Sequence, residues 1–173
     1  QFQWVVARIF ADGVYPTKED RDAVRKNVGA MIQEILVAFR TQIDQLSWMS
    51  SSSKRGAYAK LDNLVVNIAF PDWVTNDDQL IAYFKELSVS AKDSFLSMKS
   101  KLRDFNRKKN FDLLGVTDGV DRRSFRSPPS ETNAWYQPWL NSITFPGGIL
   151  HAPFYDVNYP AAVLQWWRAT RSR

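Results

Sequence analysis

The feature that most constrains the fold is a long run of apolar residues spaced three or four positions apart. The run consists of Val24, Val28, Ile32, Ile35, Phe39, Ile43 and Leu46. Such steps place side chains on one face of an α-helix. Thr17, with Asp20 three residues later, resembles the capping box that starts many helices. The sequence therefore predicts an amphipathic helix over residues 18–46, which must bury its apolar face against other elements.

A second helix is predicted after the run of serines at residues 50–53, whose hydroxyls can cap it. Apolar residues recur at helical spacing from Ala57 to Ile68, so we expect the helix to continue to Ile68. The Phe70-Pro71 pair ends it, because Pro71 lacks a backbone N–H and disfavours helical geometry at the preceding residue.

Two further helical patterns and two strand patterns complete the chain. A third helix is expected after Asn76, and a fourth runs from Ala91 towards the glycines at Gly115 and Gly119. From Thr132 onwards proline, glycine, aromatic and β-branched residues dominate, which favours short strands near residues 132–136 and 142–145. The predicted fold class is mainly α with a small C-terminal β element (α+β).

Composition excludes several kinds of protein. Hydrophobic residues make up 45% of the 173 residues, which is typical of a packed globular chain. Cysteine is absent, which excludes a disulfide framework, thiolate metal ligands and a cysteine nucleophile within these residues. No apolar run approaches the roughly 20 residues that cross a bilayer, so we expect no membrane span in this chain.

A basic cluster raises the question of nucleic-acid binding. The net charge is +5, and six cationic residues lie close together, namely Lys99, Lys101, Arg103, Arg107, Lys108 and Lys109. A nucleic-acid surface needs aromatic residues on the same face as the charges. Phe105 instead continues the apolar stripe of the predicted fourth helix, so a solvated helix face is the better interpretation and no nucleic-acid partner is expected.

Residues that carry hydrolytic chemistry are scarce. His151 is the single histidine, whereas a catalytic zinc site takes three protein ligands. The sequence holds no His-Glu-x-x-His motif, and no serine lies in a Gly-x-Ser-x-Gly elbow. We therefore predict no catalytic and no metal-binding residues in this chain.

Five segments, taken together and in order, resemble the neprilysin and endothelin-converting-enzyme family of zinc metallopeptidases. They are Leu-Ser-Trp-Met at 46–49, Ile-Ala-Phe-Pro-Asp at 68–72, Val-Asp-Arg at 120–122, Asn-Ala-Trp-Tyr at 133–136, and Ile-Thr-Phe-Pro-Gly-Gly-Ile-Leu at 143–150, which continues to 156. The resemblance covers about residues 7–163 and implies part of a thermolysin-like metallopeptidase ectodomain.

The resemblance also implies a substrate-binding pair. In that family an Asn-Ala pair forms an edge strand beside the active-site cleft, which here corresponds to Asn133 and Ala134. Asn133 would bind the peptide main chain through its amide, and Ala134 through its backbone. Trp135 replaces the more usual Phe or Tyr, and its direction is left open. Gly147 stands in place of an alanine in the family's Phe-Pro-Ala-Gly-Ile-Leu, and His151 in place of a glutamine.

Domain boundaries and cofactor follow from the same resemblance. Residues 1–163 would be part of a neprilysin-like peptidase domain, helical over 17–115 and with the substrate edge over 131–155, whereas residues 164–173 do not match the family. The zinc-binding His-Glu-x-x-His helix follows this region in the family and does not occur in this sequence. Zinc is thus implied for the full-length family member and not for this chain.

The functional expectation is a fragment of a zinc metalloendopeptidase that supplies the substrate-binding edge and is inactive alone. Its partners would be a peptide substrate and the remainder of the peptidase domain, in a parent that is extracellular or anchored as a membrane ectodomain. A non-catalytic peptide- or protein-binding scaffold is the alternative.

Overall fold

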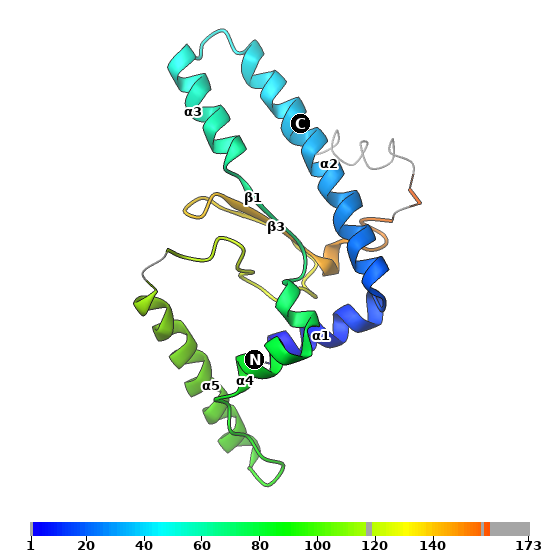
Figure 1. The fold of residues 1–173 in the computed structure, drawn as a ribbon, viewed down its shortest axis with the longest axis vertical. Coiled ribbons are helices and arrows are strands. Elements are labelled where there is room, and N and C mark those ends of the chain that lie inside the picture. The colour runs from blue at the N-terminus through cyan, green and yellow to red at the C-terminus, as the bar shows by residue number, and fades with distance from the viewer. Residues whose placement is uncertain (1, 117–118, 157, 160–173) are drawn as a thin grey trace.

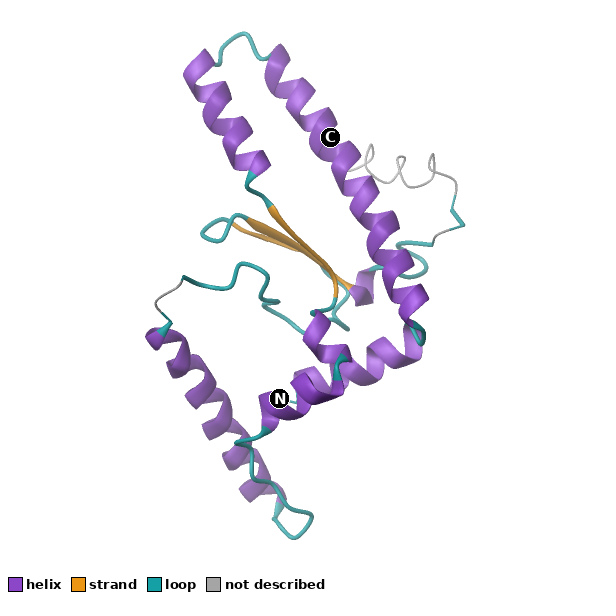
Figure 2. Ribbon diagram, in the orientation of Figure 1, coloured by secondary structure: helices purple, strands orange, loops and turns teal. Residues whose placement is uncertain are grey.

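The computed structural model describes residues 2–116, 119–156 and 158–159 (Figure 1). The predicted tail at 164–173 lies outside the described residues. In chain order the elements are α1 (Gln3–Val14), α2 (Lys18–Gln45), α3 (Ser51–Asp62), β1 (Val65–Ala69), η1 (Asp72–Thr75), α4 (Asp77–Phe84), α5 (Phe95–Asp112), η2 (Leu113–Gly115), β2 (Trp135–Gln137), β3 (Ser142–Pro146) and η3 (Gly147–Ile149). Helices and one small sheet confirm the predicted α+β class (Figure 2).

The long helix α2 begins as predicted. The backbone N–H of Asp20 donates to Thr17 Oγ1 at 3.1 Å, and the N–H of Thr17 donates to Asp20 Oδ2 at 3.2 Å, which completes a capping box. The N-terminal half of α2 buries its apolar face against the sheet, whereas Phe39 in the C-terminal half is 50% exposed. That half runs beside α3 as a helical hairpin (Figure 1), which leaves part of its predicted apolar face uncovered.

The prediction of a helix as far as Ile68 is wrong. Helix α3 ends at Asp62, and residues Val65–Ala69 form the strand β1. Three of these five residues are β-branched, and they pair in parallel with β3, with Ile68 opposite Phe145. Cross-strand pairing outweighs the helical spacing of the apolar residues, because β-branched side chains pack well on a pleated surface. The β element is therefore not confined to the C-terminal part.

The sheet has the strand order β1-β3-β2, with β2 antiparallel to β3. Its two faces differ in chemistry. Val66, Ile68 and Phe145 share the face that packs against α2, whereas Asn67 and Thr144 lie on the opposite face and bond to each other at 3.2 Å. The central strand is therefore β3, and β2 forms an edge.

The apolar core lies where α1, α2, β1 and η3 meet. Its buried members are Ala11, Tyr15, Val24, Val28, Ile32, Ala69, Phe70, Leu150 and Tyr155. Arg25 of α2 lies over the ring of Phe70 at 4.7 Å, donates to the Phe70 carbonyl at 2.7 Å and pairs with Asp72 at 2.7 Å. These contacts fasten α2 to the end of β1 and the start of η1.

An aromatic cluster joins the remaining helices. Helix α1 was not predicted from the sequence, and it packs on η1 through Trp4 and Trp73, whose ring centroids are 5.0 Å apart. Tyr83 of α4 stacks on Trp73 at 4.9 Å and meets the buried Phe105 of α5 at 5.8 Å. Phe105 therefore belongs to an apolar stripe, as the sequence predicts.

Candidate functional site

Strand β2 offers an open edge. It pairs with β3 on one side, with Tyr136 opposite Ile143, and the described residues place no strand on its other side. In an edge strand the outward N–H and C=O groups of alternate residues lack a ladder partner. The edge is therefore a place where an extended chain can add as a further strand.

The predicted pair Asn133 and Ala134 lies directly before β2 and outside its ladder, so the strand begins and ends later than predicted. Asn133 is exposed, and its Oδ1 accepts the backbone N–H of Ala134 at 2.8 Å. The Nδ2 group of Asn133 makes no hydrogen bond to the described part of the chain. The pair thus presents a side-chain amide donor at the entrance to the edge strand.

The turn η3 approaches the segment that leads to Asn133. The N–H of Gly148 donates to the Pro129 carbonyl at 2.8 Å, and Thr132 Oγ1 donates to the Gly148 carbonyl at 3.3 Å. Two of the segments that resemble the same family, around Asn133 and around Gly148, are thus brought together in space.

Tyr15, between α1 and α2, anchors η3 from the other side. Its buried hydroxyl donates to the Leu150 carbonyl at 2.9 Å and lies 3.4 Å from the Gly147 carbonyl. Burial, and secondarily the nearby Tyr155, raises the pKa of Tyr15 to about 12. Sequence analysis missed this residue, because a tyrosine in a linker carries no local signal of a contact with Leu150.

The raised pKa of Tyr15 predicts a loss of stability at high pH. An unfolded tyrosine ionises near pH 10, so folding favours the neutral hydroxyl, and its contribution is complete below pH 10 and lost as the pH rises through about 12. Across that interval the free energy of unfolding should fall by roughly 2–3 kcal/mol more in the wild-type chain than in Tyr15→Phe. Urea titrations at each pH measure this difference, and equal pH slopes for the two proteins would contradict it.

Trp135 packs inward. It lies opposite Thr144, and Gln137 lies opposite Ser142, so Trp135, Gln137 and Ser142 share one face of the sheet. Trp135 Nε1, Gln137 Oε1 and Ser142 Oγ are buried without a hydrogen-bond partner among the described residues. The partly buried indole therefore lies on the sheet face that carries Asn67 and Thr144, away from α2.

Comparison with known proteins shows which family the sequence matches. The sequence pattern of peptidase family M13 matches at residues 1–71, in its N-terminal part, and at residues 133–164, which include Asn133, Ala134 and η3. The chain belongs to peptidase family M13. Neprilysin-1 of Caenorhabditis elegans is 33% identical over 155 residues, which is 89% of this chain and 20% of that protein. An endothelin-converting enzyme homolog of Locusta migratoria is 33% identical over 133 residues, 77% of this chain and 18% of that protein.

Solved structures of the M13 fold agree. PepO from Lactobacillus rhamnosis superposes with a TM-score of 0.77 at 30% identity and covers 94% of this chain and 24% of its own. A zinc metalloprotease of Mycobacterium tuberculosis shares the fold with a TM-score of 0.65 at 22% identity, over 91% of this chain and 21% of its own. The chain spans about a fifth of the length of the M13 relatives it matches.

Zinc, which the M13 family implies for its full-length members, does not fit the residues described. Within residues 2–116, 119–156 and 158–159 no group of three or more His, Cys, Asp or Glu side chains is placed to hold a metal ion. His151 is exposed, and its Nδ1 lies 2.8 Å from the Ala152 carbonyl. The described residues therefore do not form a zinc site.

Three of the six cationic residues in the basic cluster of α5 form ion pairs with described residues. Lys101 pairs with Asp93 at 2.8 Å, and Lys108 pairs with Glu86 at 2.6 Å. The Lys101 ammonium group holds the pKa of Asp93 below its usual value, chiefly through this hydrogen bond. Lys109 lies over the ring of Tyr83 at 5.4 Å. These contacts account for part of the charge on α5, and the expectation of no nucleic-acid partner stays a prediction.

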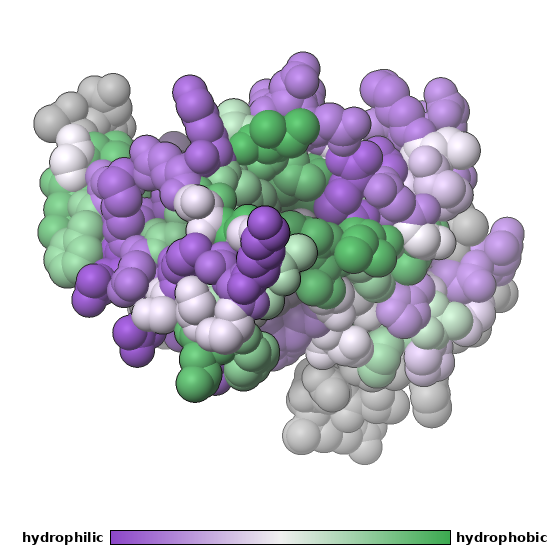
Figure 3. Space-filling view, turned by 90° about the horizontal axis from the view of Figure 1, so that it is seen from below, coloured by the Kyte–Doolittle hydropathy of each residue, from purple (hydrophilic) through white to green (hydrophobic). Residues whose placement is uncertain are grey.

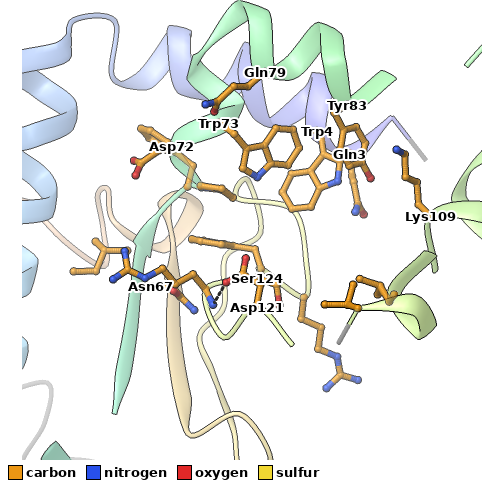
Figure 4. A pocket seen from close by; sticks show the side chains of 18 of the residues that line it. Gln3, Trp4, Asn67, Asp72, Trp73, Gln79, Tyr83, Lys109, Asp121 and Ser124 are labelled. Carbon is orange, nitrogen blue, oxygen red and sulfur yellow. Dashed lines mark hydrogen bonds between the residues drawn. The ribbon is translucent and has the colours of Figure 1, made fainter. Parts of the chain in front are cut away.

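A separate cavity of about 990 Å³ lies between α1, η1 and α4 on one side and α5 with the loop after it on the other (Figure 4). Trp4, Trp73 and Tyr83 form an aromatic wall, Lys109 of α5 reaches the Tyr83 ring, and Ser124 belongs to the loop on the other side. The predicted peptide-binding pair does not line this cavity. Its walls come from segments far apart in the sequence, so no local motif predicted it.

In the part of the chain that the structure describes, no helix has both the length and the hydropathy to cross a membrane.

Proposed function

We propose that β2, entered through Asn133 and Ala134, binds an extended peptide and supplies the substrate-binding edge of a neprilysin-like zinc metalloendopeptidase. The observation that carries the proposal is the open edge of β2 with an exposed amide donor at its start. An added peptide strand satisfies its own main-chain groups against such an edge, and a side-chain amide binds main chain without adding charge.

The small side chain of Ala134 suits this role, because a peptide backbone must come within hydrogen-bond distance of the edge. Asn133 Oδ1 holds the Ala134 N–H in the free chain. An incoming peptide carbonyl competes for that N–H, and Asn133 then has both its donor and its acceptor for the peptide. The same two residues thus switch from a contact with each other to contacts with the ligand.

Cleavage is proposed to need residues other than these 173. The sequence holds one histidine and no cysteine, which is fewer nitrogen and sulfur ligands than catalytic zinc sites use. In the full-length family member the zinc site would lie next to this edge, and this chain would hold the peptide in register. The chain by itself is proposed to bind peptide without hydrolysing it.

The remainder of the peptidase domain is the second proposed partner, in a parent outside the cell or anchored as an ectodomain. Many large apolar side chains of the described residues are mostly exposed, among them Ile9, Val37, Trp48, Ile81, Phe95, Leu96, Phe111, Leu113, Leu114, Val120 and Trp139. Apolar side chains also gather on the face seen in Figure 3. Extensive apolar surface of this kind is usually covered by other protein.

A binding experiment tests the edge directly. A fluorescein-labelled Thr-Phe-Leu-Thr-Val-Lys peptide should bind the 173-residue chain, measured by fluorescence anisotropy. The same peptide N-methylated at alternate amides should bind at least about tenfold more weakly, because it cannot complete a ladder. Asn133→Ala should weaken binding of the unmodified peptide roughly fivefold, the value of about one hydrogen bond.

The matched control is Asn110→Ala, which removes an asparagine amide on α5 and should leave the affinity unchanged. Equal affinity for the methylated and unmodified peptides would refute binding by strand addition. Zinc-dependent, chelator-sensitive cleavage of the peptide by the purified chain would refute the proposed inactivity. Binding without turnover in a longer protein that carries this segment would instead favour the scaffold alternative.

A further inference from the structure

Arg122, in the loop before β2, reaches three backbone carbonyls from two separate segments. Its Nε donates to the Leu140 carbonyl at 2.6 Å, and its Nη2 donates to the Asn141 carbonyl at 3.0 Å. The same Nη2 also donates to the carbonyl of Asn63 at the end of α3. Leu140 and Asn141 lie in the turn that joins β2 to β3. One guanidinium therefore holds this hairpin turn against the end of a helix.

The Asn63 carbonyl at the end of α3 benefits from a cation. The last carbonyls of a helix have no partner within the helix and carry its partial negative charge, so a nearby positive group is favourable. A guanidinium donates in several fixed directions at once, whereas a lysine ammonium acts as a single point charge. Arg122 can thus satisfy the α3 terminus and the hairpin turn together.

Asn141 reinforces the same junction from within the turn. It has a positive φ of 44°, in the left-handed region that asparagine tolerates better than most residues. Its Nδ2 donates to the Lys60 carbonyl of α3 at 2.8 Å, and its Oδ1 accepts from the Tyr136 hydroxyl of β2 at 3.0 Å. Its carbonyl also accepts the N–H of Val65, which starts β1, at 3.0 Å.

The edge strand has a short ladder of its own. Strand β2 is three residues long and pairs with β3 alone among the described strands. Strand β3 is itself held by β1, whereas the three residue pairs between β2 and β3 form a short ladder. The contacts of Arg122 and Asn141 attach the β2–β3 turn to α3 and to the start of β1, and so add to the ladder in fixing where β2 lies.

We propose that Arg122 is a positioning residue, which acts through the β2–β3 turn to hold the edge strand in the geometry that accepts a peptide. This inference rests on the proposed peptide-binding role of β2. It gives a role to the Val-Asp-Arg segment at 120–122, which the sequence singled out and which neither lies in the strand nor touches Asn133.

The test compares Arg122→Ala, Arg122→Lys and the control Arg123→Ala, whose native side chain makes no hydrogen bond or ion pair to the described residues. Hydrogen exchange of the wild-type 173-residue chain and each variant is followed at the amides of β2, β3 and α2, together with anisotropy for the labelled peptide. In Arg122→Ala the β2 and β3 amides should exchange about tenfold faster or more, with α2 little changed, and peptide affinity should fall by a similar factor.

Arg122→Lys should give an intermediate result, because its ammonium keeps the charge but cannot reach both segments in the same way. Arg123→Ala should match the wild type in both readouts. If Arg122→Ala does not fold, Arg122→Lys decides by the same criteria, and uniform loss of protection over α2 as well as β2 would overturn a specific positioning role.

The two proposals fail in different ways. Suppose that Arg122→Ala binds the peptide as tightly as the wild type and that its β2 and β3 amides exchange at the wild-type rate. That result overturns the role of Arg122 and leaves the proposed function standing. No peptide binding by the wild type overturns the proposed function, and the positioning role for that function falls with it, even where the exchange data show Arg122 holding the hairpin.

Discussion

Gly148→Ala should destabilise the chain by about 3 kcal/mol or more. A Cβ atom at this position would lie 2.4 Å from the Ser130 carbonyl oxygen and 2.6 Å from that of Glu131. Both obstacles are backbone atoms, so no side-chain rotation relieves the clash. Either η3 or the segment before Asn133 must move, and the hydrogen bond from Gly148 to Pro129 is lost with it. Urea denaturation followed by tryptophan fluorescence measures the change.

The control for this substitution is Gly56→Ala within α3. A Cβ atom there meets nothing within 4 Å, and alanine favours a helix interior by up to about 1 kcal/mol over glycine. The same chemical change should therefore stabilise one site and strongly destabilise the other. A Gly148→Ala protein as stable as the wild type would show that η3 does not approach the 130–131 backbone as described.

Gly148→Ala should also weaken peptide binding strongly while it leaves the structure of α2 little changed. The residues it displaces lead directly into Asn133, and Thr132 is held by the Gly148 carbonyl. A low concentration of an osmolyte should raise the folded fraction of Gly148→Ala without restoring its affinity for the peptide. The reason is that the backbone before Asn133 remains displaced in the folded variant.

Helices with a sustained period and a capping residue were predictable from the sequence. The α2 helix has both, and it begins at Lys18 as predicted. Asn76 likewise caps α4, with its Oδ1 accepting the N–H of Gln79 at 3.0 Å. The fourth helix was expected from Ala91 but begins at Phe95, because Ser94 supplies the cap and accepts the N–H of Ser97. Local hydrogen bonds decide these starts, and local sequence encodes them.

Elements that depend on distant partners were not predictable in the same way. Val65–Ala69 has apolar residues at helical spacing, and it becomes a strand because β3, more than seventy residues later, pairs with it. Helix α1 was missed, since its packing partner Trp73 lies in η1. In both cases tertiary packing outweighed the local pattern.

The candidate site shows the same division. Asn133 and Ala134 were chosen as candidates by resemblance to a family, and they lie directly before an edge strand. The groups that hold this region in place were not identified by any motif. Tyr15 and Arg122 donate hydrogen bonds to backbone carbonyls. Every residue has a backbone carbonyl, so the sequence does not show which carbonyl a distant side chain will reach.

Phe70→Ala should cost about 3–5 kcal/mol, which is the other large effect that the structure predicts. The Phe70 side chain is 2% exposed and sits between Tyr15, with ring centroids 6.0 Å apart, and the guanidinium of Arg25. Truncation removes the apolar contacts, leaves a cavity where β1 meets η1, and takes away the ring under Arg25. The Phe70 carbonyl remains, so the hydrogen bond from Arg25 should survive.

The matched control is Phe111→Ala, because Phe111 is 62% exposed on α5 and should contribute less than about 0.5 kcal/mol. Both variants are compared with the wild type by urea denaturation, with the seven tryptophans as the fluorescent probe. Equal losses for the two phenylalanines would contradict the placement of Phe70 in the core.

Phe70→Ala should also reduce the loss of stability at high pH that is assigned to Tyr15. Phe70 touches Tyr15, and Tyr15 anchors η3 through Leu150. A loosened core hydrates that hydroxyl and returns its pKa towards 10.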